Sequence, residues 1–340
     1  MRLSFEVKRH LRRLLCALGL ILAALLLFCI LRAIYLQRYL VYDENGVHLD
    51  YGGINTTVTP EKTPETEEGD FVLRQEAVVG TVEGEDAPKA NPLLRGVYVS
   101  AGQLVSDESR PGIPGALGSA NTVMLDMKTA TGKFLYHTAL AGTEKAAADL
   151  DAIEALVGEL TARQDLTVIA RIPAFQDSAF ALADFSHSLP IRGGALWIDW
   201  GGSYWLDPAG KDVADYLVST ARELKQLGFD EVVFENFSFP ASPNIWYDRQ
   251  VSGTDATLTA AQTVAQRLAS YNIPVSFQST DPAVEALSAR VYLEAENGSG
   301  VIAEAKAREA YLAGDDSRLV FLTASRDTRF QPYSTLSPLE

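Results

Sequence analysis

From residue 92 onward the sequence alternates between short apolar runs and longer amphipathic stretches, and this alternation limits the possible folds more than any other feature. Seven runs rich in β-branched and aromatic residues are expected to form strands, at residues 96–100, 122–127, 166–172, 231–237, 274–278, 290–293 and 319–323. Five stretches between or after them are expected to form helices, at residues 145–163, 213–227, 256–271, 282–289 and 302–313. Continuous apolar strands separated by helices indicate a parallel sheet that is covered on both faces.

The length of this region and the number of its strands favour a (β/α)8 TIM-barrel-like α/β domain at residues 92–340, since such barrels typically need ~250 residues. Only seven strands are clear. The eighth strand is therefore expected to be incomplete or irregular. The sequence leaves three alternatives open: it is formed by residues 330–333, it is formed by residues 71–82, or it is absent. An open, doubly wound sheet is the alternative architecture.

A second feature is the run LLCALGLILAALLLFCIL at residues 14–31, which contains no charged residue. A helix rises ~1.5 Å per residue, so this run can cross a hydrocarbon core of ~30 Å. Four basic residues at positions 8–13 precede it, and the positive-inside rule keeps that end in the cytoplasm. No small-x-small site follows, which favours an uncleaved signal anchor over a cleaved signal peptide. We therefore expect a cytoplasmic tail at 1–13, a single transmembrane anchor at 14–36 and an extracytoplasmic C-terminal domain in the cell envelope.

Residues 37–91 are expected to hold a juxtamembrane hairpin, at 39–53, and a Thr/Pro/Glu-rich linker with little to bury. Both cysteines, Cys16 and Cys29, lie in the apolar run, so the exported part has no disulfide and depends on its hydrophobic core. Residues 1–38 carry seven Lys or Arg and one acid, so with a formal net charge of −15 the remainder carries −21. Such an acidic surface repels phosphate backbones and argues against nucleic acid as a partner.

Polar residues cluster where the expected strands end, which in a parallel barrel is the face that carries active sites. They are Asp126 and Lys128 after the second strand, Arg171 and Asp177 after the third, Glu235 and Asn236 at the fourth, and Glu294 and Glu296 after the sixth. Glycoside hydrolysis needs one carboxylic acid that protonates the leaving oxygen and one carboxylate that attacks or activates water. Acids at strand ends also serve as helix caps and ion-pair partners, and this simpler interpretation stays open for each of them.

All four tryptophans fall in two segments of the same expected face. Trp197, Trp200 and Trp205 lie after the third strand, and Trp246 follows the fourth. Flat aromatic rings stack on sugar faces and line ligand pockets, although a hairpin packing its own small core would also use such rings. The four histidines are far apart and no GxSxG motif occurs, so we expect neither a metal nor another cofactor.

Four segments, taken in order and spacing, resemble a bacterial family of glycoside hydrolase-like domains with a TIM-barrel fold: GVYVS, NTVMLDMKTATGKFLY, VIARIPAFQD and WLDPAGKDVADYLVSTARELKQLGFDEVVFENFSFP. The resemblance covers residues 96–240 well and the remainder weakly. It implies matching positions that include Asp126, Lys128, Gly132, Arg171, Asp177, Trp205 and Asp207. The family typically ends its fourth strand with Asp-Tyr-x-Arg-Phe-Pro, whereas this chain has Glu235 for the Asp and Ser238 for the Arg.

These observations predict a membrane-anchored glycoside hydrolase that acts on an extracellular or cell-envelope polysaccharide by carboxylate acid/base catalysis. Glu235 is expected to be the central carboxylate, with Asp126 or Asp177 as its catalytic partner and Arg171 positioning it. The expected substrate-binding residues are Lys128, Arg171, Trp200, Trp205, Asn236, Trp246 and Glu294, with three of the tryptophans forming a sugar platform. The alternative is a catalytically inactive barrel that binds glycan or scaffolds envelope proteins, which the substitutions at positions 235 and 238 favour.

Overall fold

The computed structural model describes residues 40–43, 46–49, 93–210, 212–312 and 314–339. The chain divides into two units, Met1–Thr81 and Val82–Glu340. In the first unit, β1 (Leu40–Asp43) pairs antiparallel with β2 (Gly46–Leu49), where the sequence predicts a hairpin. The predicted anchor and linker lie outside the described residues. Within the described part of the chain, every helix is too short or too polar to cross a membrane.

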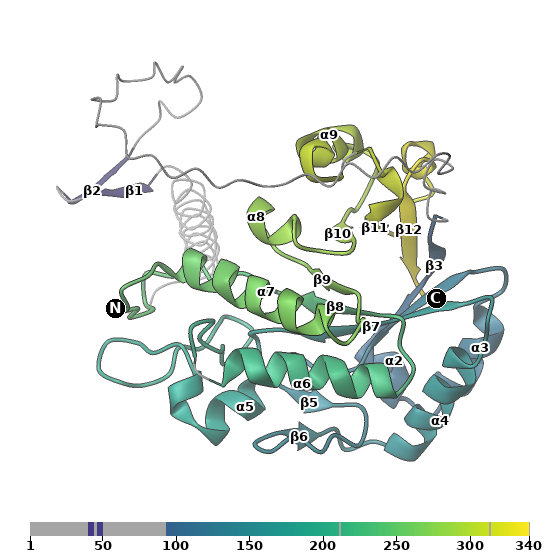
Figure 1. The fold of residues 1–340 in the computed structure, drawn as a ribbon, viewed down its shortest axis with the longest axis horizontal. Coiled ribbons are helices and arrows are strands. Elements are labelled where there is room, and N and C mark those ends of the chain that lie inside the picture. The colour runs from purple at the N-terminus through teal and green to yellow at the C-terminus, as the bar shows by residue number, and fades with distance from the viewer. Residues whose placement is uncertain (1–39, 44–45, 50–92, 211, 313, 340) are drawn as a thin grey trace, which may run out of the picture. The chain divides into compact units, whose positions relative to one another are not determined.

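The second unit is built on one sheet of eight parallel strands, whose order around the sheet is their order along the chain (Figure 1). The strands are β3 (Arg95–Val99), β4 (Thr122–Asp126), β7 (Thr167–Pro173), β8 (Glu231–Glu235), β9 (Val275–Phe277), β10 (Val291–Glu294), β11 (Leu319–Leu322) and β12 (Ser334–Pro338). The last strand, β12, pairs with the first, β3, in the register Thr335↔Arg95. The sheet is therefore a nearly closed barrel, and the prediction of a TIM-barrel-like fold is confirmed.

Barrel closure is completed between β9 and β10, the one pair of neighbours without a hydrogen-bonded ladder in the described sheet. The backbone N–H of Ala289 donates to the carbonyl oxygen of Val275 at 2.8 Å. One residue further on, the N–H of Arg290 donates to the side-chain oxygen of Ser276 at 2.9 Å. These two bonds hold the residues just before β10 against β9, and we call this joint the seam.

A buried glutamate reinforces the seam from inside the barrel. Glu231, at the start of β8, is 1% exposed and accepts hydrogen bonds from Ser276 Oγ at 2.6 Å and Tyr292 Oη at 3.1 Å. Its other carboxylate oxygen accepts from Arg290 Nη1. A buried carboxylate is tolerated only when charge and hydrogen bonds compensate its lost hydration, and here donors from β9 and β10 supply both.

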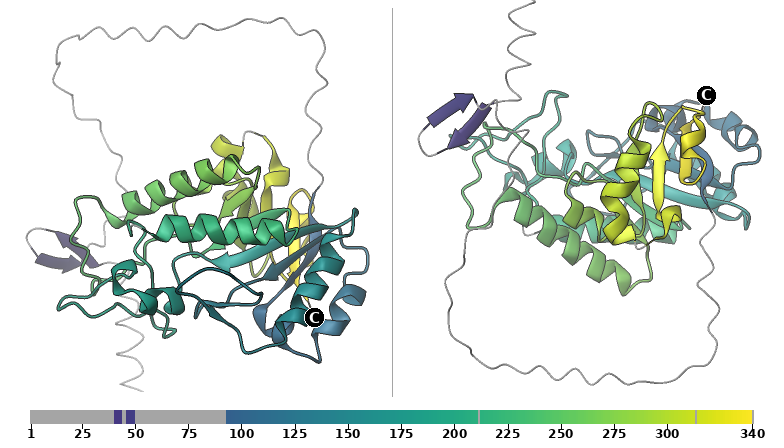
Figure 2. Two further views of the ribbon diagram at one scale, coloured as in Figure 1. Left: turned by 60° about the horizontal axis from the view of Figure 1, so that its bottom comes forward. Right: turned by 90° about the horizontal axis from the view of Figure 1, so that it is seen from above.

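The helices lie outside the strands, and α6 and α7 run side by side along the sheet (Figures 1 and 2). The α-helices are α2 (Ala101–Val105), α3 (Ile113–Ala116), α4 (Leu150–Thr161), α5 (Ser178–Ala183), α6 (Val213–Gln226), α7 (Gly253–Ala269), α8 (Pro282–Glu285) and α9 (Val301–Leu312). Short 3-10 turns occur at η2 (Arg110–Gly112), η3 (Phe185–His187), η4 (Asp316–Arg318) and η5 (Thr328–Phe330), and β5 (Lys133–Phe134) pairs with β6 (Glu144–Lys145) in the loop before α4. Each of the five predicted helical stretches contains a helix. The stretch at 145–163 begins later than predicted, because Asp149 caps α4 by accepting from the N–H of Ala152 at 3.0 Å.

Strand side chains alternate between two cores, which explains why the strands read as continuous apolar runs. On β4, Val123 and Leu125 face the helices, whereas Met124 joins the cluster inside the barrel. On β7, Val168 faces the helices and Ile169 points inward. Each such fully buried apolar side chain stabilises the fold by roughly 1.5–3 kcal/mol.

The eighth strand is β12, which directly follows residues 330–333, one of the three alternatives that the sequence leaves open, and Thr328–Phe330 forms a 3-10 turn. Its sequence, STLSP, has one large apolar residue, Leu336, which is fully buried inside the barrel. Ser334 is buried by hydrogen bonding: its Oγ accepts from the N–H of Leu94 at 3.0 Å and donates to the carbonyl of Ser317 at 2.9 Å. A strand held in this way lacks the apolar pattern by which strands are found in sequence.

Candidate active site

Three charged side chains meet at the carboxyl ends of β4, β7 and β8. Asp126 and Arg171 are register partners on β4 and β7, and Glu235 ends the next strand. Arg171 donates to both carboxylate oxygens of Asp126, at 2.7 Å from Nε and 3.2 Å from Nη2. Its remaining nitrogen, Nη1, lies 3.9 Å from Oε1 of Glu235. The guanidinium therefore sits between the two carboxylates and holds them on one rim of the barrel.

A tyrosine that the sequence reasoning missed supports this arginine. The ring of Tyr98, near the end of β3, lies under the Arg171 guanidinium, with 4.4 Å between the Cζ atom and the ring centroid. Asp126 accepts a further hydrogen bond from the N–H of Ala101 at 3.3 Å. Both groups fix the Asp126–Arg171 pair, since a cation over an aromatic face is attracted by the ring quadrupole. An aromatic residue inside an apolar run reads as core, so only its place at a strand end could have drawn attention to it.

The surroundings of Glu235 favour its protonated form. Burial raises the pKa of Glu235 above its ordinary value, the charge of Arg171 lowers it, and the charges of Asp126 and Glu294 raise it further, with a net upward shift. Burial lowers the pKa of Arg171. The hydrogen bonds to Asp126 and the negative charges of Asp126 and Glu235 outweigh this effect, so that the pKa of Arg171 is raised overall. Arg171 is thus a permanent cation beside a carboxylic acid that keeps its proton to a higher pH than usual.

Glu235 and Arg171 open into a pocket of about 600 Å³ at the barrel mouth. Its lining residues are Tyr98, Arg171, Glu235, Glu294, Ala295, Glu296, Leu322, Thr323, Ala324 and Pro338. Glu294, at the end of β10, and Glu296 are exposed side chains. In the described residues no group of three or more His, Cys, Asp or Glu side chains is arranged to hold a metal ion.

Asp177 and Lys128 form a separate, fully buried cluster outside this pocket. Lys128 Nζ lies 3.0 Å from Asp177 Oδ2, which also accepts from Tyr216 Oη at 2.5 Å. The other oxygen, Oδ1, caps α5 by accepting from the N–H of Phe180 at 2.9 Å. Burial lowers the pKa of Lys128, and the adjacent Asp177 acts against that shift. With both side chains 0% exposed, the structure gives these two residues a packing role and does not bring them to Glu235.

A chain of hydrogen bonds links the loop after β7 to the residue that follows Glu235. Asn236 Nδ2 donates to Gln176 Oε1 at 3.0 Å, and Gln176 Nε2 donates to Asp199 Oδ2 at 2.7 Å. The indole N–H of Trp205 donates to the same Asp199 oxygen at 2.7 Å. Asn236 has a positive φ of 54°, which asparagine tolerates better than most residues. Two predicted binding residues, Asn236 and Trp205, are therefore joined through side chains that hold the loop in place.

The predicted aromatic platform is distributed over different surroundings. Trp200 is fully exposed, and Trp246 is 43% exposed with the Arg192 guanidinium 4.2 Å from its ring centroid. Trp246 lines a second hollow of about 600 Å³ together with Trp197 and Ile198. Trp197 and Trp246 thus share a hollow that is separate from the mouth pocket, and Trp200 lines neither of the two.

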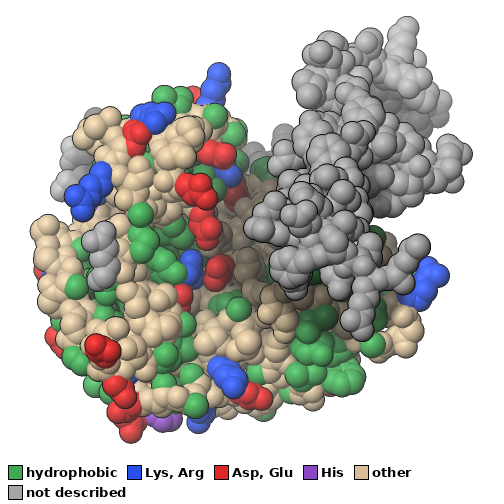
Figure 3. Space-filling model, turned by 180° about the vertical axis from the view of Figure 1, so that it is seen from behind, with side chains coloured by type: hydrophobic (Ala, Val, Ile, Leu, Met, Phe, Trp, Pro, Cys, Tyr) green, Lys and Arg blue, Asp and Glu red, His purple; other side chains and the backbone are tan. Residues whose placement is uncertain are grey.

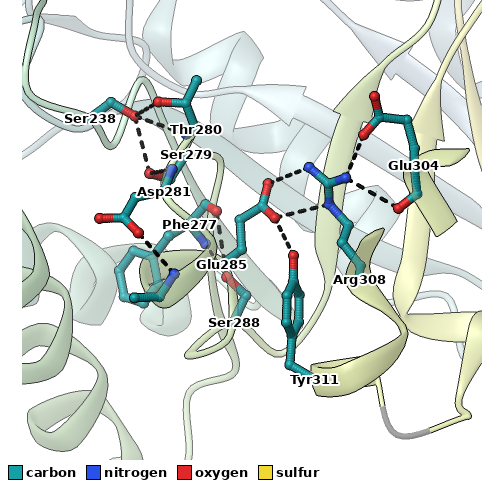
Figure 4. A network of polar contacts seen from close by, with 11 residues as sticks. Ser238, Phe277, Ser279, Thr280, Asp281, Glu285, Ser288, Glu304, Arg308 and Tyr311 are labelled. Carbon is teal, nitrogen blue, oxygen red and sulfur yellow. Dashed lines mark hydrogen bonds and ion pairs between the residues drawn. The ribbon is translucent and has the colours of Figure 1, made fainter. Parts of the chain in front are cut away.

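The position where Ser238 replaces the family's arginine connects two loops at the mouth. Its hydroxyl lies 3.1 Å from Ser279 Oγ and accepts from the N–H of Thr280 at 3.1 Å (Figure 4). In the same view, the buried Glu285 of α8 accepts from Tyr311 Oη at 2.5 Å and faces the guanidinium of Arg308 at 2.9 Å, both on α9. These contacts brace the short helix α8, which has only one turn of its own.

A parallel (β/α)8 barrel with carboxylates gathered at its mouth has the architecture of many glycoside hydrolases. A family model described as "Putative glycosyl hydrolase domain" (DUF4015) matches residues 96–287. The chain belongs to this family, and the resemblance found in the sequence is confirmed.

Several solved structures are similar to the chain at low sequence identity. The chain matches an exo-β-N-acetylglucosaminidase from Vibrio harveyi at 8% identity, over 72% of this chain and 50% of that one, with a TM-score of 0.50. It also matches a hypothetical protein from Ruminiclostridium thermocellum at 21% identity, over 55% and 98% of the two chains, with a TM-score of 0.44. The glycoside hydrolase domain of PelA from Pseudomonas aeruginosa matches at 14% identity, over 71% and 93%, with a TM-score of 0.45. The sequence matches no curated protein.

Proposed function

We propose that this protein is a membrane-anchored glycoside hydrolase that cleaves an extracellular or cell-envelope polysaccharide. The observation that carries the proposal is the pocket in which Glu235, whose pKa is raised, shares the barrel mouth with the exposed carboxylate of Glu294. Two carboxyl groups in different surroundings are what acid/base cleavage of a glycosidic bond requires.

In this mechanism Glu235 is the general acid. It donates its proton to the glycosidic oxygen as the bond from that oxygen to the anomeric carbon breaks, which releases the leaving sugar as an alcohol. Glu235 is then ionised, and Arg171 at 3.9 Å stabilises the new charge. Both oxygens of Asp126 are already engaged by Arg171, so we assign Asp126 the role of orienting the guanidinium.

Glu294 is the second carboxylate of the proposal. It accepts a proton from the water that attacks the anomeric carbon, and the water oxygen becomes the new hydroxyl of the product. Glu235 ends β8 and Glu294 ends β10, so a whole strand, β9, lies between them, and their separation is wider than the ~4.8 Å between adjacent paired strands. Inverting enzymes hold their carboxyl groups ~6.5–9.5 Å apart, and we therefore expect inversion at the anomeric carbon.

The test compares Glu235→Gln with the parent chain for release of reducing ends from wall and capsular polysaccharides. Glu309→Gln, an exposed change on α9 outside the pocket lining, is the matched control. We expect the control to keep its activity and Glu235→Gln to lose at least ~100-fold, as is typical when a general acid is removed. Equal rates for Glu235→Gln and parent would remove Glu235 from the mechanism. No release by any of the three chains, with glycan binding retained, would favour the inactive glycan-binding barrel.

The membrane tether is part of the same proposal and rests on the uncharged run at residues 14–31. Such a run partitions into a bilayer core, and the basic residues before it orient the rest of the chain outward. We expect the full-length chain to stay in the membrane fraction after an alkaline carbonate wash, and its C-terminal unit to be cleaved by protease added to spheroplasts. Release by carbonate would argue against the tether without affecting the hydrolase proposal.

A further inference from the structure

The charges that line the mouth pocket are unbalanced. Its acidic lining residues are Glu235, Glu294 and Glu296, and Arg171 is the one basic residue among the described residues that line it. The two-point contact with Asp126 already neutralises Arg171. Even when Glu235 holds its proton, Glu294 and Glu296 leave the pocket negative.

Neighbouring basic groups do not correct this balance. Arg308, close to the Glu296 side of the mouth, is engaged by Glu285 at 2.9 Å and by Glu304. Arg326 lines a different hollow, on the β11–β12 side. Acidic side chains gather near the centre of one face of the molecule in the space-filling view (Figure 3).

Glu296 has no task in the proposed chemistry, which needs Glu235, Glu294 and the Asp126–Arg171 pair. Its side chain is exposed and, among the described residues, takes part in no ion pair. It lines both the mouth pocket and an adjoining hollow of about 540 Å³, so it borders the path of a chain that extends beyond the cleavage point. A carboxylate placed there and left unpaired repels anionic sugars and attracts cationic ones.

We propose that the substrate is a cationic polysaccharide, one whose hexosamine units carry free amino groups, and that Glu296 recognises such an ammonium group. This inference rests on the proposed hydrolase function and specifies its substrate class. An ammonium group is protonated at neutral pH and donates up to three hydrogen bonds, so it complements a carboxylate in both charge and geometry. Uronic acid or phosphorylated polymers are excluded by the same charge, which gives the pocket its discrimination.

The experiment measures binding by calorimetry to the full-length chain carrying Glu235→Gln, so that turnover does not interfere. The probes are glucosamine and galactosamine oligomers with free amines, the same oligomers fully N-acetylated, and a galacturonic acid oligomer. We expect the free-amine oligomers to bind roughly tenfold more tightly than their acetylated counterparts at low salt, with the preference shrinking as salt screens the charges. Adding Glu296→Lys should weaken binding of the free-amine oligomers by about tenfold and change acetylated binding by less than about twofold.

Glu309→Lys is the matched control, because it alters the net charge equally on an exposed part of α9. It should leave the preference unchanged, which separates recognition in the pocket from general attraction of a cation to an acidic protein. Equal binding of charged and neutral oligomers, tighter binding of the galacturonic acid oligomer, or no binding of either free-amine oligomer overturns the inference. Cleavage of a neutral polysaccharide by the parent chain, without an amine preference, keeps the hydrolase and rejects the substrate class. An amine preference without any cleavage keeps the ligand class and rejects the hydrolase.

Discussion

Replacing Glu231 by glutamine tests how the barrel is closed. The change is isosteric, but it removes the negative charge that accepts hydrogen bonds from Ser276, Tyr292 and Arg290 at the seam. Hydrogen bonds to a charged group contribute about 1.5–3 kcal/mol each, and glutamine keeps one accepting oxygen, so we expect a loss of about 3 kcal/mol. Breaking one partner of a buried ion pair gives a similar figure, about 3–5 kcal/mol.

Thermal and urea unfolding measure this loss. For a unit of this size each kcal/mol lowers Tm by about 2–4 °C, so Glu231→Gln should melt roughly 6–12 °C below the parent. Glu309→Gln, exposed on α9, should melt within about 1 °C of the parent, since surface changes rarely exceed about 0.5 kcal/mol. In a double-mutant cycle with Arg290→Met, the double variant should lose less stability than the two single variants lose together, because it leaves no buried charge without its partner. A Glu231→Gln chain as stable as the control would refute the view that this carboxylate closes the seam.

Three further predictions concern the mouth and the buried cluster beside it. Because burial raises the pKa of Glu235 above 4.5, its protonated form is favoured by folding; that stabilisation is present at low pH and is lost as the pH rises through the folded-state pKa. The proposed hydrolysis rate should fall as the pH rises through the folded-state pKa of Glu235, and a rate that stays constant there contradicts its role as the acid. Glu235→Gln should increase resistance to urea at pH values above that pKa but not below it. Gly132→Ala should cost about 3 kcal/mol, since its Cβ would lie 1.9 Å from Asp177 Oδ1 at a φ of +87°. The matched change Gly193→Ala, with a φ of +102° and no atom within 4 Å, should cost only about 1 kcal/mol in the same urea titration; equal losses would show that the close approach to Asp177 is unimportant. Arg171→Lys should keep the far-UV circular dichroism but lower the rate of reducing-end release at least tenfold, because lysine cannot make the two-point contact with Asp126; an unchanged rate would rule out a role for that geometry.

Much of the fold can be predicted from the sequence, because most strands are buried on both faces and therefore appear as continuous apolar runs. Seven strands and five helical stretches were expected where the structure has them, with ends shifted by a few residues. The exception is β12, which is stabilised by hydrogen bonds of Ser334 and by pairing with β3, two features that have no local apolar pattern. The seam is equally hidden from sequence, because nothing distinguishes Glu231 from any other acid at the first position of a strand.

Asp126, Glu235 and Glu294 are the last residues of β4, β8 and β10, and Arg171 lies near the end of β7, so the carboxyl ends of the strands bring these four residues to one rim. The same is not true of Asp177, which lies four residues beyond the end of β7 and turns back to cap α5. Past the last paired residue the path of the chain is set by tertiary contacts, which no local pattern records. The same limit explains why the tryptophans, all in long loops, are spread over separate surroundings.

The seam has a consequence for how members of such a family can diverge. Seven joints between the strands are set by ladders of backbone pairs, whose spacing is the same for every sequence, whereas the joint between β9 and β10 has one backbone hydrogen bond and otherwise depends on the side chains that bridge it. Mutations at Ser276 or Tyr292 can therefore change the spacing between β9 and β10 and leave the spacing of the other strands unaltered. Because Glu235 and Glu294 lie on opposite sides of this joint, natural variation at the floor of the barrel can change the distance between the two carboxyl groups at its mouth.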